Sequence, residues 1–236
     1  MGNTYTDALK FWNSAFMMDD ESKEEFIKDI DIENGWKDLA SSEKLSDVIV
    51  RELADKSNVL DYGCGEGWAG IVLNKSGCKK VTCVDVVENA IELANFLKNS
   101  FKIESGLTMQ HVSDTWIKEV DSKTYDGVFC SNVIDVLPKE VSDEIIENIA
   151  RIATDDAKIV IAMNYYTKAE SNPEKHLEVK NGNELYVDGI LRMISRSDEE
   201  WTEIFNKYFT VERIEYFAWP GETEEKRRIF IMKKRK

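Results

Sequence analysis

Cysteine, histidine and proline are scarce in this sequence, and their scarcity excludes several kinds of protein. Among 236 residues there are 4 cysteines, 2 histidines and 3 prolines. The cysteines form no C-x-x-C pair and fall mostly in or beside apolar runs, so we expect reduced thiols in the core of a cytoplasmic protein. Two histidines and no clustered cysteines argue against a structural metal. The cysteines are Cys64, Cys78, Cys83 and Cys130.

Long apolar runs and a secretory leader are also missing. No stretch approaches the roughly 20 apolar residues of a membrane span, and the first residues do not have the pattern of a signal peptide. We therefore expect a cytoplasmic protein with no membrane contact. A hydrophobic content of 42% in 236 residues is enough for one domain with a full core.

Positive charge is in deficit. The chain has 45 Asp and Glu against 31 Lys and Arg, which gives a net charge of −14. Because nucleic-acid binding depends on a basic face that contacts phosphates, a DNA or RNA substrate is disfavoured. The basic stretch at residues 226–236 contains the apolar run Ile229 to Met232, so it fits a last strand with charged flanks better than an RNA-binding arm.

A glycine cluster between a strand and a helix is the most informative feature that is present. A buried-strand pattern ends at Asp61, the pattern G-x-G-x-G covers Gly63 to Gly67, and a helix-like segment follows at once. Glycines permit positive φ and let a ligand lie against the backbone. The segment therefore predicts the first strand-turn-helix of a nucleotide-binding α/β sheet. A dinucleotide fingerprint would need its third glycine where Trp68 stands.

Asp85 follows a second predicted strand, residues 80–84. It lies about twenty residues beyond the glycines, where α/β nucleotide sites place the carboxylate that accepts hydrogen bonds from ribose hydroxyls. A carboxylate suits a ribose diol because it accepts hydrogen bonds and donates none. The alternative is an Asp that ends the strand and caps the next helix, predicted from Glu88 to Asn99. The spacing favours the ribose interpretation.

Two further predicted strands also end in polar residues. Residues 107–112 alternate like a strand and are followed by Asp114, for which a simple turn role is the alternative. A fourth strand begins at Tyr125 and would place Ser131 and the next residue at the carboxyl end of the central strand, where ligands bind in open α/β sheets. Pro138 would then stand in the first turn of a helix that ends at residue 152.

In this order, the four segments resemble the motifs of the class I S-adenosylmethionine-dependent methyltransferases, over roughly residues 40–236. The resemblance implies a Rossmann-like α/β fold: a doubly wound, seven-stranded, mostly parallel sheet with an antiparallel last strand. It also implies S-adenosylmethionine as donor, S-adenosylhomocysteine as product, and no metal. In that family the glycine loop passes under the methionine part of the cofactor, and the acidic residue after the third strand binds the adenine amino group, so Trp116 would cover the ring. The implied cofactor-binding residues are Asp61, Gly63, Cys64, Gly65, Gly67, Trp68, Asp85, Val86, Ser113, Asp114, Thr115, Ser131 and Asn132.

The segment after the fourth strand departs from the family pattern. Many small-molecule members carry a His near its end, where this chain has Asp135-Val136, so no His base is implied. The N-P-P-Y motif for amino groups of bases is absent. We therefore expect a small-molecule acceptor with an O, N or C nucleophile. The alternatives are a non-catalytic protein that binds the donor or its product, an RNA or protein methyltransferase, and a nicotinamide-dependent oxidoreductase.

The chain is expected to form a single domain, residues 1–236, with four parts. Residues 1–54 predict a helical preface or lid, residues 55–163 the cofactor-binding core, residues 164–196 a substrate-side insertion with a hairpin, and residues 197–236 the last helix and two strands. The insertion is interpreted as a lid or as a strand-pairing contact in a homodimer. An aromatic stripe in the preface either faces the core or contacts ligands; its members are Tyr5, Phe11, Trp12 and Phe16.

Four residues lie in segments expected to surround the transferred methyl group. Asp135, Tyr165, Tyr166 and Arg192 are the candidate catalytic or substrate-binding residues. Each has a structural alternative: a turn for Asp135, the edge of the core for the tyrosines and a surface ion pair for Arg192. Since no general base is evident, positioning of the acceptor and exclusion of water would supply most of the rate.

Overall fold

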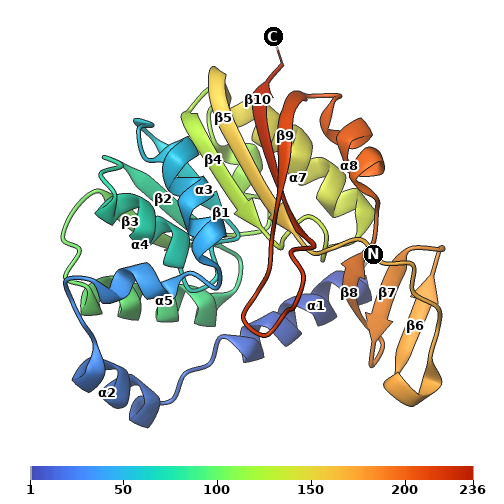
Figure 1. Cartoon of the computed structure of the whole chain (residues 1–236), viewed down its shortest axis with the longest axis horizontal. Helices are drawn as coiled ribbons and strands as arrows, with labels where there is room; N and C mark the ends of the chain where they lie inside the picture. Colours follow the sequence, from blue (N-terminus) through green and yellow to red (C-terminus); the bar gives the residue numbers. More distant parts are fainter. Residues whose placement is uncertain (1, 236) are drawn as a thin grey trace.

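A computed structural model of the chain describes residues 2–235, so the two ends of the expected domain, residues 1 and 236, lie outside it. A seven-stranded sheet forms its centre, with the strand order β3-β2-β1-β4-β5-β10-β9 (Figure 1). Only β10 runs antiparallel to its neighbours, and the other adjacent pairs are parallel. The predicted fold is confirmed. The strands are β1 (Val59–Tyr62), β2 (Val81–Asp85), β3 (Leu107–His111), β4 (Tyr125–Ser131), β5 (Ala153–Met163), β9 (Phe209–Phe217) and β10 (Arg227–Lys234).

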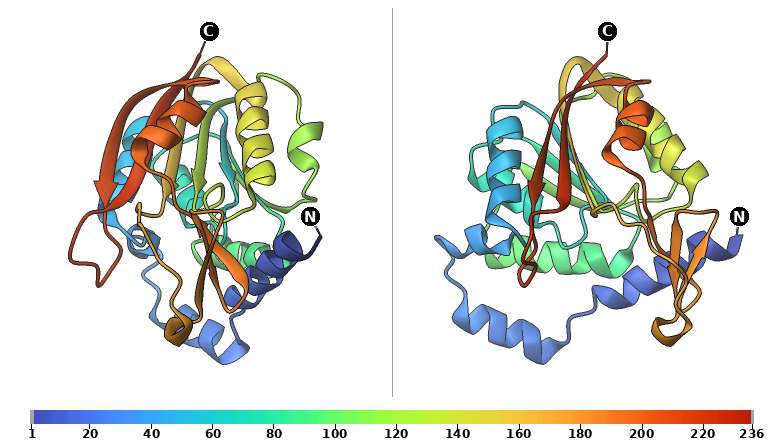
Figure 2. Two further views of the ribbon diagram at one scale, coloured as in Figure 1. Left: turned by 90° about the vertical axis from the view of Figure 1, so that its right-hand side faces the viewer. Right: turned by 45° about the vertical axis from the view of Figure 1, so that its right-hand side comes forward.

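Helices cover both faces of this sheet (Figure 2). Side chains alternate along a strand, so in β4 Phe129 packs into one hydrophobic cluster while Val128 and Cys130 pack into the other. The central strand β1 is buried along its whole length, as expected for a parallel strand covered on both sides. One face carries α3 (Glu43–Leu53), α4 (Trp68–Lys75) and α5 (Glu88–Ser100). The other carries α6 (Trp116–Glu119), α7 (Lys139–Ile152) and α8 (Asp198–Phe205).

The preface is helical, as predicted. It contains α1 (Gly2–Ala15), α2 (Asp20–Asp29) and the short 3-10 helix η1 (Gly35–Leu39) before α3. Ser42 caps α3 by accepting a hydrogen bond from the backbone N–H of Leu45. In contrast, α2 buries none of its side chains. Figure 1 shows α1 crossing below the carboxyl ends of the parallel strands.

The insertion after β5 is a small antiparallel sheet, ordered β6-β7-β8. Its strands are β6 (Leu177–Lys180), β7 (Glu184–Val187) and β8 (Ile190–Ile194), preceded by the 3-10 helix η2 (Pro173–Lys175). The predicted hairpin is confirmed, but sequence reasoning missed β8 because its residues do not alternate between apolar and polar. The small sheet has its own apolar cluster and contacts α1 through β8.

Two predicted boundaries were wrong. The apolar run from Lys158 to Met163 predicts a fifth strand that begins at Lys158, but β5 begins at Ala153, because Ala153 already pairs with Tyr125 of β4. Pro138 is the N-cap residue of α7 and lies just outside its first turn.

Candidate cofactor site

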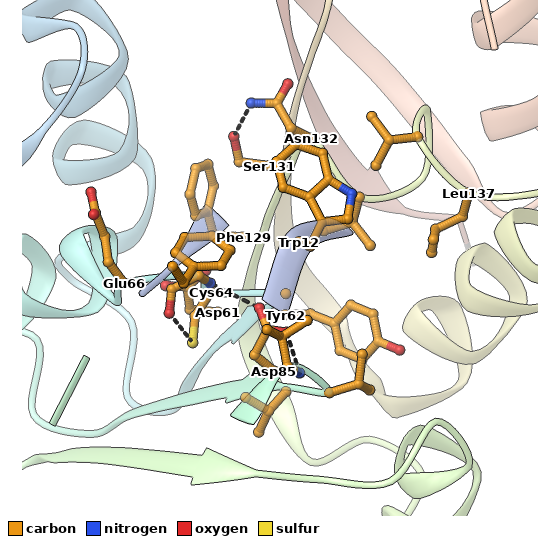
Figure 3. A pocket seen from close by; sticks show the side chains of 18 of the residues that line it. Trp12, Asp61, Tyr62, Cys64, Glu66, Asp85, Phe129, Ser131, Asn132 and Leu137 are labelled. Carbon is orange, nitrogen blue, oxygen red and sulfur yellow. Dashed lines mark hydrogen bonds between the residues drawn. The ribbon is translucent and has the colours of Figure 1, made fainter. Parts of the chain in front are cut away.

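A cavity of about 350 Å³ lies between the carboxyl ends of the central strands and helix α1 (Figure 3). It opens beside β1 and β4, where the strand order reverses and where open α/β sheets bind ligands. Its lining joins the two faces of the sheet: Leu45, Trp68 and Trp219 pack with α3–α5, whereas Tyr62 and Leu137 pack with α6–α8.

The glycine loop forms the floor of this cavity. The backbone N–H groups of Gly63 and Cys64 donate to the carbonyl oxygen of Val84, at 2.9 and 3.0 Å, which fixes the loop to β2. Gly63 and Gly65 have φ of +70° and +54°, values that side chains rarely allow. A Cβ on Gly65 would lie 3.0 Å from the ring of Phe16 in the segment after α1. The loop therefore provides bare backbone for a ligand to lie against.

Gly67 plays a different part. A Cβ there would lie 2.7 Å from Met109 and 3.0 Å from Ala94, both in the core. Gly67 does not line the cavity, and it permits the helix α4 to pack close to β3 and α5. The third glycine is thus a packing residue.

Asp85 lies at the end of β2 and borders the cavity, as predicted. Its carboxylate accepts hydrogen bonds from the backbone N–H groups of Gly65 and Val87, each at 2.9 Å. Burial raises the pKa of this carboxyl, and the hydrogen bonds from the backbone oppose the rise. Each carboxylate oxygen retains acceptor capacity, so the residue fits a ribose diol while it also positions the loop.

Asp61 is 2% exposed, and its Oδ2 has no hydrogen-bond partner among the described residues. Burial raises the pKa of its carboxyl to about 7, against a hydrogen bond from the Cys83 side chain; the nearby charge of Asp85 adds to the rise. A buried acceptor without a partner costs free energy unless a ligand satisfies it. The orphaned oxygen and the bare glycine loop together fit a cationic donor such as S-adenosylmethionine.

Ser131 and Asn132 reach the cavity from the end of β4, as predicted. Asn132 adopts a left-handed φ of +53°, and its backbone N–H donates to Ala162 of β5. The Oδ1 atom of its side chain is buried without a partner among residues 2–235. The end of β4 therefore offers a second unsatisfied acceptor.

The aromatic stripe of the preface divides between two roles. Tyr5, Trp12 and Phe16 line the cavity, which favours the lid interpretation for these three. Phe11 faces away, with the guanidinium carbon of Arg192 3.8 Å from its ring centroid. Two residues further along α1, Asn13 is bonded to Asn89 of α5 by two hydrogen bonds of 3.2 and 2.8 Å. Helix α1 is therefore fixed to both the core and the insertion.

The expected adenine-binding residues lie outside the cavity lining. Ser113, Asp114 and Thr115 are exposed, and Trp116 is partly buried against the core. Asp114 is nevertheless close enough to Tyr5 to act on it: burial, Asp114 and Asp85 together raise the pKa of the Tyr5 hydroxyl to about 12. Their binding to adenine stays a prediction.

None of the four candidate substrate residues lines the cavity. Asp135 is fully buried, and its Oδ2 accepts two hydrogen bonds of 2.9 Å from the backbone and the side chain of Asn164. Tyr165 and Tyr166 are exposed and border a separate surface groove. Arg192 stacks on α1 from the insertion. Sequence reasoning placed them near the methyl group because their segments follow strand ends, but their side chains turn elsewhere.

Several cavity residues were missed by sequence reasoning, among them Trp219 and Glu66. Trp219 enters from the loop between β9 and β10, and no local pattern marks it. The guanidinium of Arg227 lies 3.4 Å from its ring centroid, and Arg227 also donates to Asn164. A chain of contacts therefore links Asp135, through Asn164 and Arg227, to Trp219. Glu66 lies within the glycine pattern, and this position is a sequence signal that could have identified it as a cavity residue.

Two global features of the described chain are relevant to function. Between residues 2 and 235, no three His, Cys, Asp or Glu side chains are arranged to hold a metal ion. None of the helices described there has the length and apolar character of a membrane span.

Comparison with known proteins identifies the family. A profile described as a methyltransferase domain matches residues 53–209. The ribosomal protein L11 methyltransferase of Thermosipho melanesiensis is 36% identical over 110 residues, which cover 44% of this chain and 39% of that protein. The chain therefore spans about two fifths of that relative's length.

Solved structures share the fold at low sequence identity. The PH0226 protein of Pyrococcus horikoshii superposes with a TM-score of 0.65 at 16% identity, covering 89% of this chain and 99% of that one. The 1,6-didemethyltoxoflavin-N1-methyltransferase of Burkholderia thailandensis, solved with 1,6-didemethyltoxoflavin and S-adenosylhomocysteine, gives 0.63 at 16% identity over 91% and 87% of the two chains. With the matched profile, the strand order and the glycine loop, the chain belongs to the class I S-adenosylmethionine-dependent methyltransferase family.

Proposed function

We propose that the protein transfers a methyl group from S-adenosylmethionine to a small-molecule acceptor. The observation that supports this most directly is the position of α1, whose Tyr5 and Trp12, with Phe16 just beyond it, line the cavity opposite the glycine loop. An acceptor must then be small enough to lie beneath a helix. The cavity volume of about 350 Å³ agrees with small-molecule sites, which span about 300–1,000 Å³.

The donor would be held by residues of the core. Gly63 and Gly65 would lie under its methionine part, Asp85 would accept from its ribose hydroxyls, and Asp61 would face its positive charge. When bound, the donor supplies an electrophilic methyl group. The protein's contribution is to orient the acceptor and to exclude water, the task that we assign to α1.

The four parts of the domain fit this function. We assign residues 1–54 to the lid, residues 55–163 to donor binding and residues 197–236 to the last helix and strands. Residues 164–196 contribute no side chain to the cavity, and they contact α1 through β8. The insertion would therefore support the lid without touching the acceptor.

Protein methylation is the second candidate, and the similarity to ribosomal protein L11 methyltransferases favours it. The chain spans only 39% of the length of the Thermosipho relative, so most of that protein has no counterpart in the alignment. The net charge of −14 does not favour an RNA acceptor. A small acceptor explains the covered cavity better than a protein does.

A methyl-transfer assay tests the proposal. Purified protein is incubated with S-adenosylmethionine tritiated on the methyl group, together with pools of small metabolites or with recombinant ribosomal protein L11. We expect label in a small product and none in the protein. Label in ribosomal protein L11 would contradict a small acceptor, whereas donor binding without transfer to any pool would favour a non-catalytic binding protein.

A further inference from the structure

The cavity is lined by acidic side chains and by no basic ones. Within the described chain, its lining includes Asp61, Glu66 and Asp85, and it includes no Lys, Arg or His. An anionic group, such as a carboxylate or a phosphate, would find no cation to pair with there and would be repelled by the carboxylates. The lining therefore suits neutral or positively charged ligands.

Glu66 is the acidic residue of the cavity lining to which we have assigned no role in donor binding. It stands between Gly65 and Gly67, where the loop enters α4. No hydrogen bond or ion pair joins its carboxylate to any residue in the described range, although burial raises the pKa of the group. Figure 3 shows Glu66 at one side of the cavity and Leu137 at the opposite side, with Asp61 and Asp85 between them.

Aromatic side chains accompany Glu66 in the lining. Trp68 follows it on α4, with its ring centroid 5.9 Å from that of Phe129, and Phe16 overlies Gly65. Trp219 joins them from the loop between β9 and β10. A cation near aromatic faces is attracted by their quadrupoles, and the attraction grows when water is excluded. This end of the cavity suits an organic cation with an apolar body.

Contacts with neighbouring residues hold Trp219 in its position in the cavity lining. One of its faces is covered by Arg227, whose charge is neutralised by hydrogen bonds to Glu222. The backbone N–H of Trp219 also donates to Glu222, at 2.9 Å. The arginine is therefore occupied within the protein and does not cancel the negative charge of the cavity.

The charge of the donor does not balance the carboxylates that line the cavity. S-adenosylmethionine carries a sulfonium, an ammonium and a carboxylate, so its net charge is about +1 at neutral pH. Asp61 and Asp85 already border the glycine loop and the end of β2, where the donor would lie. Three carboxylates therefore face a donor of net charge about +1, and the charge that the donor leaves unbalanced would attract a second cation.

We propose that the acceptor is an amine with an aromatic or aliphatic body, that Glu66 binds its ammonium group, and that the methyl group is transferred to that nitrogen. This inference rests on the proposed function and specifies its substrate class. The ammonium gives one proton to the Glu66 carboxylate, and the freed lone pair forms the N–C bond. The C–S bond breaks with its electrons left on sulfur. The products are a methylammonium ion and S-adenosylhomocysteine, and Glu66 then releases its proton to water.

The raised pKa of Glu66 helps this sequence, because a more basic carboxylate accepts a proton more readily. Once Glu66 has taken the proton it is neutral, so its contribution is to free the lone pair and to hold the amine in place while the positive charge moves from sulfur to nitrogen. An oxygen or carbon nucleophile offers no ammonium group for Glu66 to bind.

A binding experiment with neutral and charged probes tests the proposal without turnover. The protein is saturated with S-adenosylhomocysteine, and benzylamine, phenethylamine and tryptamine are titrated by calorimetry beside the matching alcohols and carboxylates. We expect at least one amine to bind at least tenfold more tightly than its alcohol. Glu66→Gln should abolish that preference and leave the affinity for S-adenosylhomocysteine within twofold. Glu104→Gln, an exposed change of the same charge, is the control.

The outcomes separate this inference from the proposed function. If wild-type protein does not bind S-adenosylhomocysteine, the proposed function fails first. If it binds and no amine exceeds its alcohol or carboxylate, the amine inference is wrong. If Glu66→Gln weakens S-adenosylhomocysteine and spares the amines, Glu66 belongs to the donor site and the inference is also wrong. A pH profile that rises toward the pKa of the amine in the wild type, and flattens in the variant, would support proton transfer to Glu66.

Discussion

The two walls of the cavity are built differently. The core wall consists of loops that follow buried strands, and backbone hydrogen bonds from Gly63, Cys64 and Gly65 fix it to β2 and its terminal carboxylate. The opposite wall is helix α1, in which Ala8 is the one buried side chain among those described. Helix α1 is held near its C-terminal end by a pair of hydrogen bonds from Asn89 to Asn13 and by Arg192, which stacks on Phe11.

This difference indicates which wall binds the donor and which admits the acceptor. A wall fixed by the backbone is preorganised, so it suits a donor that is the same in every turnover. A helix with few buried contacts opens at low free-energy cost, so it suits the admission of an acceptor. Substitutions in the core wall should therefore act on donor affinity, and substitutions near α1 should act on transfer.

The largest effect is expected from Gly65→Val in the core wall. The residue has φ of +54°, and a Cβ would lie 3.0 Å from the Phe16 ring in the space left for a ligand. Affinity for S-adenosylhomocysteine should fall on the order of 100-fold or more, measured by calorimetry on protein shown to be folded by circular dichroism. Gly189→Val, at φ of +76° with open space around it, carries similar backbone strain and should bind normally. Normal binding by Gly65→Val would remove the glycine loop from the donor site.

Replacing residues 170–190 with a short Gly/Ser turn should break the other wall. This change removes β6 and β7, which support β8 and the contact of Arg192 with α1. We expect affinity for S-adenosylhomocysteine within a few-fold of wild type and loss of methyl transfer, because the lid no longer closes over the acceptor. Transfer at full rate would show that the insertion does not support the lid. Loss of cofactor binding would place the insertion in the donor site.

Asp85→Ala sharpens the comparison within the core wall. The change removes the carboxylate proposed to accept from the ribose, and charge-assisted hydrogen bonds contribute about 1.5–3 kcal/mol each. The dissociation constant of S-adenosylhomocysteine should rise about tenfold or more. Asp29→Ala, an exposed change at the end of α2, serves as the control and should have no effect. An unchanged dissociation constant for Asp85→Ala would contradict the ribose assignment.

Asp61→Asn tests how the buried carboxyl group in the core wall affects the free energy of unfolding. Folding raises the pKa of Asp61 from 3.8 to about 7, so between these values the folded protein keeps a proton that the unfolded chain has lost. The contribution of Asp61 to the free energy of unfolding therefore falls as pH rises through this window. Relative to wild type, the variant should gain roughly 2–3 kcal/mol on going from about pH 5 to about pH 8, measured by denaturant unfolding. A pH-independent difference would contradict the raised pKa.

Arg192→Ala should have the smallest effect, on the lid wall. A partly exposed cation–π contact contributes about 0.5–1 kcal/mol, so hydrogen exchange of the α1 amides should speed up two- to fivefold, roughly. Lys37→Ala is a matched control, because its ammonium lies 5.5 Å from the ring centroid of Trp36 in η1, outside α1. Equal exchange in α1 for both variants would mean that Arg192 does not hold the lid.

The residues of the core wall could be predicted from the sequence, because short-range sequence patterns mark them. Asp61, the glycine pattern and Asp85 sit at strand ends, and the order of parallel strands brings such ends to one edge of the sheet. Strand runs, capping residues and the hairpin turn are short-range signals as well. The fold followed from the same patterns.

The acceptor side could not be predicted, because it depends on distant contacts. Asp135 was predicted to be a substrate residue, but its carboxylate is buried and accepts a hydrogen bond from Asn164. Trp219 reaches the cavity only because β10 pairs between β5 and β9, and no neighbouring residue signals that pairing. Arg192 contacts α1 because it lies on β8. The residues of β8 do not alternate between apolar and polar, so this strand could not be predicted from the sequence.

The most direct test of the central claim is a crystal structure of the protein with S-adenosylhomocysteine. We predict that the ribose hydroxyls contact Asp85, that the amino-acid part lies on the backbone of Gly63 and Gly65, and that Tyr5, Trp12 and Phe16 cover the ligand. Density for the cofactor anywhere other than between the glycine loop and α1 would contradict the account.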